Sequence, residues 1–277
     1  ASQAAKRLAE DGCCVLIFLP GIGEISALQD ELDGAVGGAY GTGPRLDVRV
    51  LHSLVPREEQ DAAMRPAAPG TCKVILSTNI AESSVTIPDV RLVIDAGLHR
   101  GIFYDDRRKV PSLRCAWCSR ASARQRAGRA GRVAPGTVLR LYTRAFFEGC
   151  MPTYDAAEMA RVPLEKAVLN VKILMAKLGS ASELLSQALT PPPKERILSA
   201  VRVLFESGAL SKDDESSEVT RLGRLAAALP LDLNLVKLVV LGQAVGCVVD
   251  AVVMAATLSL QDPFAMPSSV FVRDQGT

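Results

Sequence analysis

Apolar runs with the length of buried strands alternate with amphipathic segments over the first half of the chain. The runs lie at residues 13–19, 45–51, 73–77, 91–95 and 137–142, and helical spacing marks residues 22–32, 57–64 and 122–130. Because the helical segments fall between the strands, this order predicts an α/β fold with a parallel, doubly wound sheet. Residues 102–115 have a polar centre between two strand-like arms and predict a protruding β-hairpin.

The pattern becomes helical after Phe147. Helical spacing covers residues 158–178, 193–207 and 222–229, and a polar turn with strand-like residues 218–220 precedes the last of these. This order predicts a small winged-helix module. We therefore expect a sheet domain over 1–147 with its hairpin at about 101–116, a winged-helix domain over 148–229, and an all-α region over 230–277.

Residues 238–260 are apolar enough to suggest a membrane span. Gln243, Asp250 and several small residues interrupt the run, which is better explained by two packed helices. We expect no membrane association. The seven cysteines are an odd number, and the sequence shows no signal peptide, so we expect an intracellular protein, cytoplasmic or nuclear. The single pair Cys115 and Cys118 is too few ligands for zinc, and no metal site is predicted.

Positive charge is concentrated in one part of the chain. The net charge is only +2, yet residues 91–132 hold eleven Lys and Arg against three Asp and Glu. A run of this kind is usually a solvated basic face. Here it contains the segment Gln-Arg-Ala-Gly-Arg-Ala-Gly-Arg at 125–132, whose arginines recur every three residues and would share one face of a helix. The interior glycines would each cost about 1 kcal/mol in a helix, which close approach of a nucleotide or another domain would explain.

Four segments, in order, resemble motifs of superfamily 2 helicases of the DEAH/RNA-helicase-A type. They are LIFLPG at 16–21, LHSL at 51–54 followed by PREEQ at 56–60, STNIAESSVTI at 77–87, and QRAGRAGR at 125–132. The resemblance covers about 130 residues and continues into the helical part. The tract 112–132, LGR at 222–224 and FAMP at 264–267 resemble most the Tudor-domain-bearing, spindle-E-like branch.

The resemblance implies one half of an NTP-hydrolysing site. Gln125 would orient the attacking water or contact the γ-phosphate, and Arg129 and Arg132 would be arginine fingers. Arg126 would instead hold its helix against the sheet. Nucleotide contacts are expected from Thr86, Asp89 and Met64. The sequence departs from the family pattern at two places: Met64 replaces a base-stacking aromatic residue, and Pro88, followed by Asp89, stands where an acidic residue is usual.

The resemblance also implies an RNA track. Thr78 and Asn79 would contact phosphates at the end of a strand, and His52 and Ser53 would form a second RNA-touching loop. The alternatives are a plain turn with an N-cap at 77–84 and a structural histidine. Arg107 and Arg108 would lie at the tip of a wedge-like hairpin.

The sequence contains no Gly-Lys dipeptide and hence no P-loop. We therefore expect ATP or another NTP, with Mg²⁺, to be bound mainly by a first RecA-like domain that is missing here and would act in cis. The joined protein would be an ATP-dependent RNA helicase that moves 3′ to 5′, its all-α region would begin a ratchet domain, and the isolated fragment would be inactive. Two alternatives stay open: a non-catalytic RNA-binding or scaffold relic, and a DNA helicase of the same superfamily.

Overall fold

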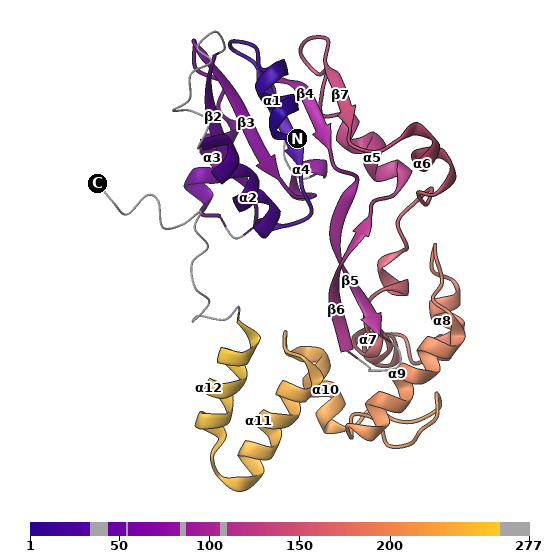
Figure 1. Cartoon of the computed structure of the whole chain (residues 1–277). Helices are drawn as coiled ribbons and strands as arrows, with labels where there is room; N and C mark the ends of the chain where they lie inside the picture. Colours follow the sequence, from indigo (N-terminus) through magenta and orange to yellow (C-terminus); the bar gives the residue numbers. More distant parts are fainter. Residues whose placement is uncertain (34–43, 54, 84–86, 106–109, 261–277) are drawn as a thin grey trace. The chain divides into compact units, whose positions relative to one another are not determined.

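The computed structural model describes residues 1–33, 44–53, 55–83, 87–105 and 110–260. The chain divides into two compact units, which are described separately (Figure 1). Of the described residues, the first unit holds Ala1–Gly101 and Leu113–Asp155, and the second holds Ile102–Ser112 and residues 156–260.

The described residues of the first unit form a five-stranded parallel sheet in the order β2-β3-β1-β4-β7. The strands are β1 (Cys14–Phe18), β2 (Arg45–Leu51), β3 (Thr71–Ser77), β4 (Val90–Asp95) and β7 (Thr137–Arg140). Every residue of β1 is buried, because this central strand has a neighbour on each side and helices over both faces. The predicted parallel α/β sheet is confirmed.

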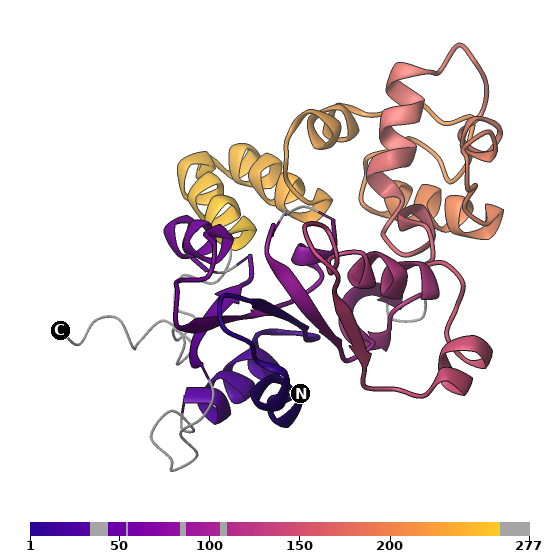
Figure 2. The ribbon, with the colours of Figure 1, turned by 90° about the horizontal axis from the view of Figure 1, so that it is seen from above.

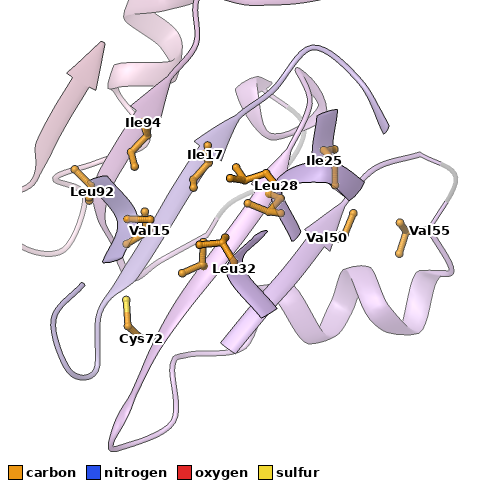
Figure 3. Close-up of a cluster of buried hydrophobic side chains, with 13 residues drawn as sticks. Val15, Ile17, Ile25, Leu28, Leu32, Val50, Val55, Cys72, Leu92 and Ile94 are labelled. Atoms are coloured by element: carbon orange, nitrogen blue, oxygen red, sulfur yellow. The ribbon is translucent and has the colours of Figure 1, made fainter. Parts of the chain in front are cut away.

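Helices cover both faces of this sheet. They are α1 (Ser2–Leu8), α2 (Ile22–Asp33), α3 (Arg57–Met64), α4 (Ile80–Ser83), α5 (Arg120–Ala127) and α6 (Arg144–Gly149). Val15 and Ile17 point to the face covered by α2, where they meet Ile25, Leu28 and Leu32 (Figure 3). The alternate residues of β1 point to the other face, where α3 and α4 pack (Figure 2). Each fully buried aliphatic side chain contributes about 1.5–3 kcal/mol.

Strands β5 (Leu98–Asp105) and β6 (Val110–Trp117) pair as a separate two-stranded sheet, which confirms the predicted hairpin. Arg100 near its base is ion-paired with Glu24 of α2 at 2.9 Å. Arg107 and Arg108, predicted at its tip, lie outside the described residues.

The second unit is helical, as predicted for the C-terminal region. It contains the 3₁₀ helix η1 (Glu158–Ala160), α7 (Glu165–Leu174), α8 (Ala181–Ser186), α9 (Lys194–Glu206), α10 (Arg221–Ala228), α11 (Leu233–Val245) and α12 (Val248–Ser259). The helical pattern over 158–178 is interrupted at Pro163, which separates η1 from α7. The strand-like residues near 219 make only an isolated bridge, between Leu210 and Val219.

The apolar stretch 238–260 falls on two helices, as predicted. Gly246 ends α11 in the left-handed conformation with φ +87°, and α12 begins two residues later. The two helices approach closely at Gly242, where an added Cβ would lie 2.3 Å from the Cβ of Ala251. Among the helices described in the chain, none is long and apolar enough to cross a membrane.

Candidate functional site

Polar residues gather where the parallel strands of the first unit end. Thr78 and Asn79 follow β3, and His52 and Ser53 follow the neighbouring strand β2. Leu51 and Ser77 are paired in register, so these two short segments leave the sheet side by side. The structure thus brings four of the six predicted RNA-contacting residues to one edge of the sheet, and the other two, Arg107 and Arg108, lie outside the described residues. This is the edge at which open parallel sheets bind ligands.

Exposure differs among these four residues. Asn79 and Ser53 are exposed, His52 is half-buried, and the Thr78 side chain is buried. Burial lowers the pKa of His52, so its imidazole is neutral at pH 7. His52 can therefore offer a phosphate a hydrogen bond rather than a charge.

A one-turn helix, α4, follows directly from the Thr78–Asn79 segment. The Glu82 N–H donates to the Asn79 carbonyl at 2.9 Å, and the Ala81 N–H donates to the Thr78 carbonyl at 3.4 Å. A helix of four residues has too few internal hydrogen bonds to be stable alone. Its position must therefore be fixed by contacts with other elements.

Helix α5 carries the first half of the arginine-rich segment. Its N-cap is Ser119, whose hydroxyl accepts from the Ser122 N–H at 3.0 Å. The helix ends at Ala127, and the chain continues as turns in which Gly131 has φ +78°. The expectation of a helix to residue 130 with three arginines on one face is wrong, because the segment leaves the helix at Gly128. Arg129 and Arg132 instead lie on the turns that follow.

Arg126 points inward and is 1% exposed. Its Nη1 donates to Asp95 Oδ1 at 2.9 Å and to the Leu98 carbonyl at 3.1 Å, and its Nε donates to Glu82 Oε2 at 3.2 Å. The guanidinium also lies 5.1 Å from the centre of the Phe18 ring. The predicted structural role of Arg126 is confirmed: it ties α5 to the end of β4 and to α4.

Further hydrogen bonds complete this buried network. Tyr142 donates its hydroxyl to Asp95 Oδ2 at 3.0 Å, and the Gly97 N–H donates to Asp95 Oδ1 at 2.9 Å. Burial and the Asp95 carboxylate raise the pKa of Tyr142, which keeps its proton near neutral pH. Sequence reasoning missed Asp95 and Glu82. Two signals were available in the sequence. Asp95 is a carboxylate at the end of a buried strand, and Glu82 is a carboxylate one helical turn after Asn79.

The predicted catalytic residues lie on and just after α5. Gln125 and Arg132 are exposed, and Arg129 is half-buried. Burial and repulsion from Arg132 lower the pKa of Arg129, while attraction by Glu82 opposes this shift. Arginine stays charged despite such a shift, so two neighbouring cations concentrate positive potential here. The side-chain donors of Gln125, Arg129 and Arg132 suit the phosphates of a nucleotide. The residues that this chain would contribute to a nucleotide site therefore fit that ligand.

Asp89 is held away from this edge. It precedes β4, next to Lys73 near the start of β3, whereas Thr78 follows the end of β3. Lys73 Nζ lies 3.0 Å from Asp89 Oδ1, and the Ala67 N–H donates to Asp89 Oδ2 at 3.0 Å. A ribose hydroxyl would have to share this carboxylate with the buried lysine. Met64, at the end of α3, is half-buried against the sheet core, and Thr86 lies outside the described residues.

Comparisons with known proteins agree with this geometry. Residues 3–134 match the helicase conserved C-terminal domain family. The chain is 30% identical to the Escherichia coli DEAH/RHA helicase HrpB, with a TM-score of 0.80 over 97% of this chain and 32% of that one. These matches place the chain among the superfamily 2 helicases of the DEAH type.

The sequence relatives narrow this placement. The chain is 45% identical over 259 residues to the ATP-dependent RNA helicase TDRD9 of Danio rerio, and 44% identical over 260 residues to that of Homo sapiens. It is 40% identical over 264 residues to the probable ATP-dependent RNA helicase spindle-E of Aedes aegypti. These alignments cover 91–92% of this chain and 18–19% of the relatives, so the chain spans about a fifth of their length. Within the DEAH type, the chain is similar to members of the spindle-E-like branch.

Proposed function

We propose that this chain is the second RecA-like half, with the adjoining helical region, of an ATP-dependent RNA helicase that moves 3′ to 5′. One observation carries the proposal: the predicted RNA-contacting turn at Thr78 and the arginine-bearing helix α5 are joined through the buried Arg126 network at one edge of the sheet. In such a motor, hydrolysis and RNA movement must be coupled. The Arg126 network connects the proposed RNA-contacting turn with helix α5, and the proposed catalytic residues lie on and just after that helix.

On the nucleotide side, the residues of this chain complete a site that a first RecA-like domain begins. The nucleotide, when bound with Mg²⁺, supplies the phosphoryl group that is transferred to water. Arg129 and Arg132 hold charge next to that group, and Gln125 presents an amide that can orient a water molecule. Because these side chains meet a nucleotide only when the first domain is joined in cis, the isolated chain is expected to be inactive.

On the RNA side, the four residues at the ends of β2 and β3 bind the sugar–phosphate backbone. Exposed Asn79 and Ser53 offer side-chain donors, and neutral His52 adds another. None of these contacts reads a base, so binding would be independent of sequence. The hairpin Arg107 and Arg108 would add contacts at the duplex junction. We assign residues 148–229 to a winged-helix domain and 230–277 to the start of a ratchet domain.

The test is Arg132→Ala in the protein that joins this chain to its first RecA-like domain. Loss of a finger should lower RNA-stimulated ATP hydrolysis by about 10³-fold or more. RNA binding without nucleotide, measured by fluorescence anisotropy, should change little, because Arg132 is not among the proposed RNA contacts. Retained hydrolysis would refute the finger assignment. Wild-type RNA binding without any hydrolysis would favour the scaffold alternative, and equal stimulation by DNA would favour a DNA helicase.

A further inference from the structure

Glu82 of α4 grips α5 at two points. Its Oε1 accepts from the Ser122 hydroxyl at 2.6 Å, and its Oε2 accepts from Arg126 Nε at 3.2 Å. Ser122 and Arg126 are four residues apart, so they lie one above the other on the same face of α5. The carboxylate therefore bridges two successive turns of the helix.

Attachment at two points constrains a helix differently from attachment at one. A single ion pair fixes the distance between α4 and α5 but lets α5 roll and tilt about the contact. With two contacts along one face, both the roll and the tilt are set. A side chain ends roughly 5–6 Å from the helix axis, so a roll of about 20° would move the Gln125 amide by about 2 Å. A misplacement of about 1 Å can already cost about 10²-fold in rate.

Glu82 also belongs to the RNA-facing segment. Its own N–H donates to the Asn79 carbonyl, and its helix begins one residue after Asn79. Because α4 is too short to be stable alone, any shift of the Thr78–Asn79 turn carries the Glu82 carboxylate with it. The carboxylate transmits this shift to the two turns of α5 that precede Arg129.

We propose that Glu82 is a positioning residue that sets the roll of α5 from the RNA-facing turn, so that RNA on that turn aligns Gln125 and the arginine fingers. This inference rests on the proposed function and identifies the contact through which RNA stimulates hydrolysis. The Ser122 hydroxyl is one of the two contacts by which Glu82 holds α5, and we call these two contacts, to Ser122 and to Arg126, the bracket. In the described network, the hydroxyl bonds to no side chain other than Glu82. A purely structural ion pair between Glu82 and Arg126 would not depend on it.

The experiment compares three variants of the protein that carries both RecA-like domains. Ser122→Ala removes one point of the bracket but keeps the backbone N–H that bonds to Ser119. Glu82→Gln keeps an acceptor for Arg126 and a donor for Ser122. Thr71→Val is the matched control, because it removes a hydroxyl that donates to the Ala68 carbonyl at 2.7 Å where β3 begins, at the opposite edge of the sheet.

Ser122→Ala should lower the RNA-stimulated kcat at least about fivefold, while KM for ATP and RNA affinity without nucleotide stay within about twofold. Its Tm should match that of Thr71→Val, which should keep the wild-type kcat. Glu82→Gln should retain most of the wild-type kcat, because the bracket survives in it.

Two results would overturn the inference alone: wild-type kcat in Ser122→Ala, or an equal loss in Thr71→Val. In either case, a wild-type protein that hydrolyses ATP on RNA and an inactive Arg132→Ala would leave the proposed function standing. A wild-type protein without RNA-stimulated hydrolysis would overturn the proposed function and this inference with it.

Discussion

Replacing Arg126 by methionine tests how strongly the buried network stabilises the first unit. Methionine fills much of the same space and removes the charge. The substitution leaves the carboxylate of Asp95, which is fully buried, and that of Glu82, whose side chain is 14% exposed, without their cation. It also leaves the Leu98 carbonyl without its donor.

The expected loss of stability follows from these contacts. Removing one partner of a buried ion pair costs about 3–5 kcal/mol, because an uncompensated charge remains in the interior. Asp95 keeps two donors, Gly97 N–H and the Tyr142 hydroxyl, which favours the lower part of that range. The lost bond to Leu98 adds about 1 kcal/mol. We therefore expect Arg126→Met to lower the free energy of unfolding by about 4 kcal/mol, a large share of the roughly 5–15 kcal/mol of a typical domain.

Urea unfolding followed by tryptophan fluorescence measures this change. The sequence has one tryptophan, Trp117, which lies in the first unit with its ring 4.6 Å from that of Phe146. Its emission therefore reports the unfolding of that unit. Arg49→Met is the matched control, because the same exchange there breaks only an exposed pair with Asp47 and should cost less than about 1 kcal/mol.

A second substitution decides whether the orphaned charge is the cause. Asp95→Asn in the Arg126→Met background keeps the acceptor for Gly97 and removes the uncompensated charge. The double variant should be more stable than Arg126→Met by about 1–2 kcal/mol. A double variant that is no more stable than the single one would refute this reasoning.

Two further predictions concern titrating groups in the first unit. Burial raises the pKa of both Cys72 and Cys118 to about 11. In maleimide labelling at pH 8, followed by mass-spectrometric mapping, these two thiols should therefore react far more slowly than the exposed thiols of Cys115, Cys150 and Cys247. Equal labelling would contradict their burial. Burial and Asp95 raise the pKa of Tyr142 in the folded protein. Above about pH 10, the folded protein therefore keeps a phenol proton that the unfolded chain loses. The stability from this group is present below about pH 10 and is lost as the pH rises further. Urea unfolding of Tyr142→Phe between pH 9 and 11 should therefore show a smaller alkaline loss of stability than the wild type, and parallel curves would be the contrary result.

The strands were predictable because burial on both faces leaves a direct trace in the sequence. The runs at 13–19 and 91–95 match β1 and β4 within one residue. A parallel sheet places all strand ends of one kind at one edge, so the grouping of His52 with Thr78 also followed once the strands were located.

The end of α5 and the partners of Arg126 were harder to predict. Arginine spacing of three residues is compatible with a helix, and only the backbone at Gly128 and Gly131 shows that the helix stops first. Arg126 is buried because partners from distant parts of the chain, Glu82 and Asp95, converge on it. Such tertiary contacts have no local signature. The same holds for the carboxylate of Asp89, which Lys73 holds at the opposite edge of the sheet.

The burial of one arginine within the segment 125–132 affects how any mutational scan of that segment is interpreted. Replacing Arg126 with alanine would abolish activity in a cell-based screen, as would replacing Arg132, but the first loss would come from protein that unfolds and is degraded. The two classes separate in an immunoblot: variants at Arg126 should fall in abundance, whereas variants at exposed Arg132 should accumulate to normal levels. Under the proposed function, an inactive but abundant protein that still occupies RNA is the form expected to act as a dominant inhibitor.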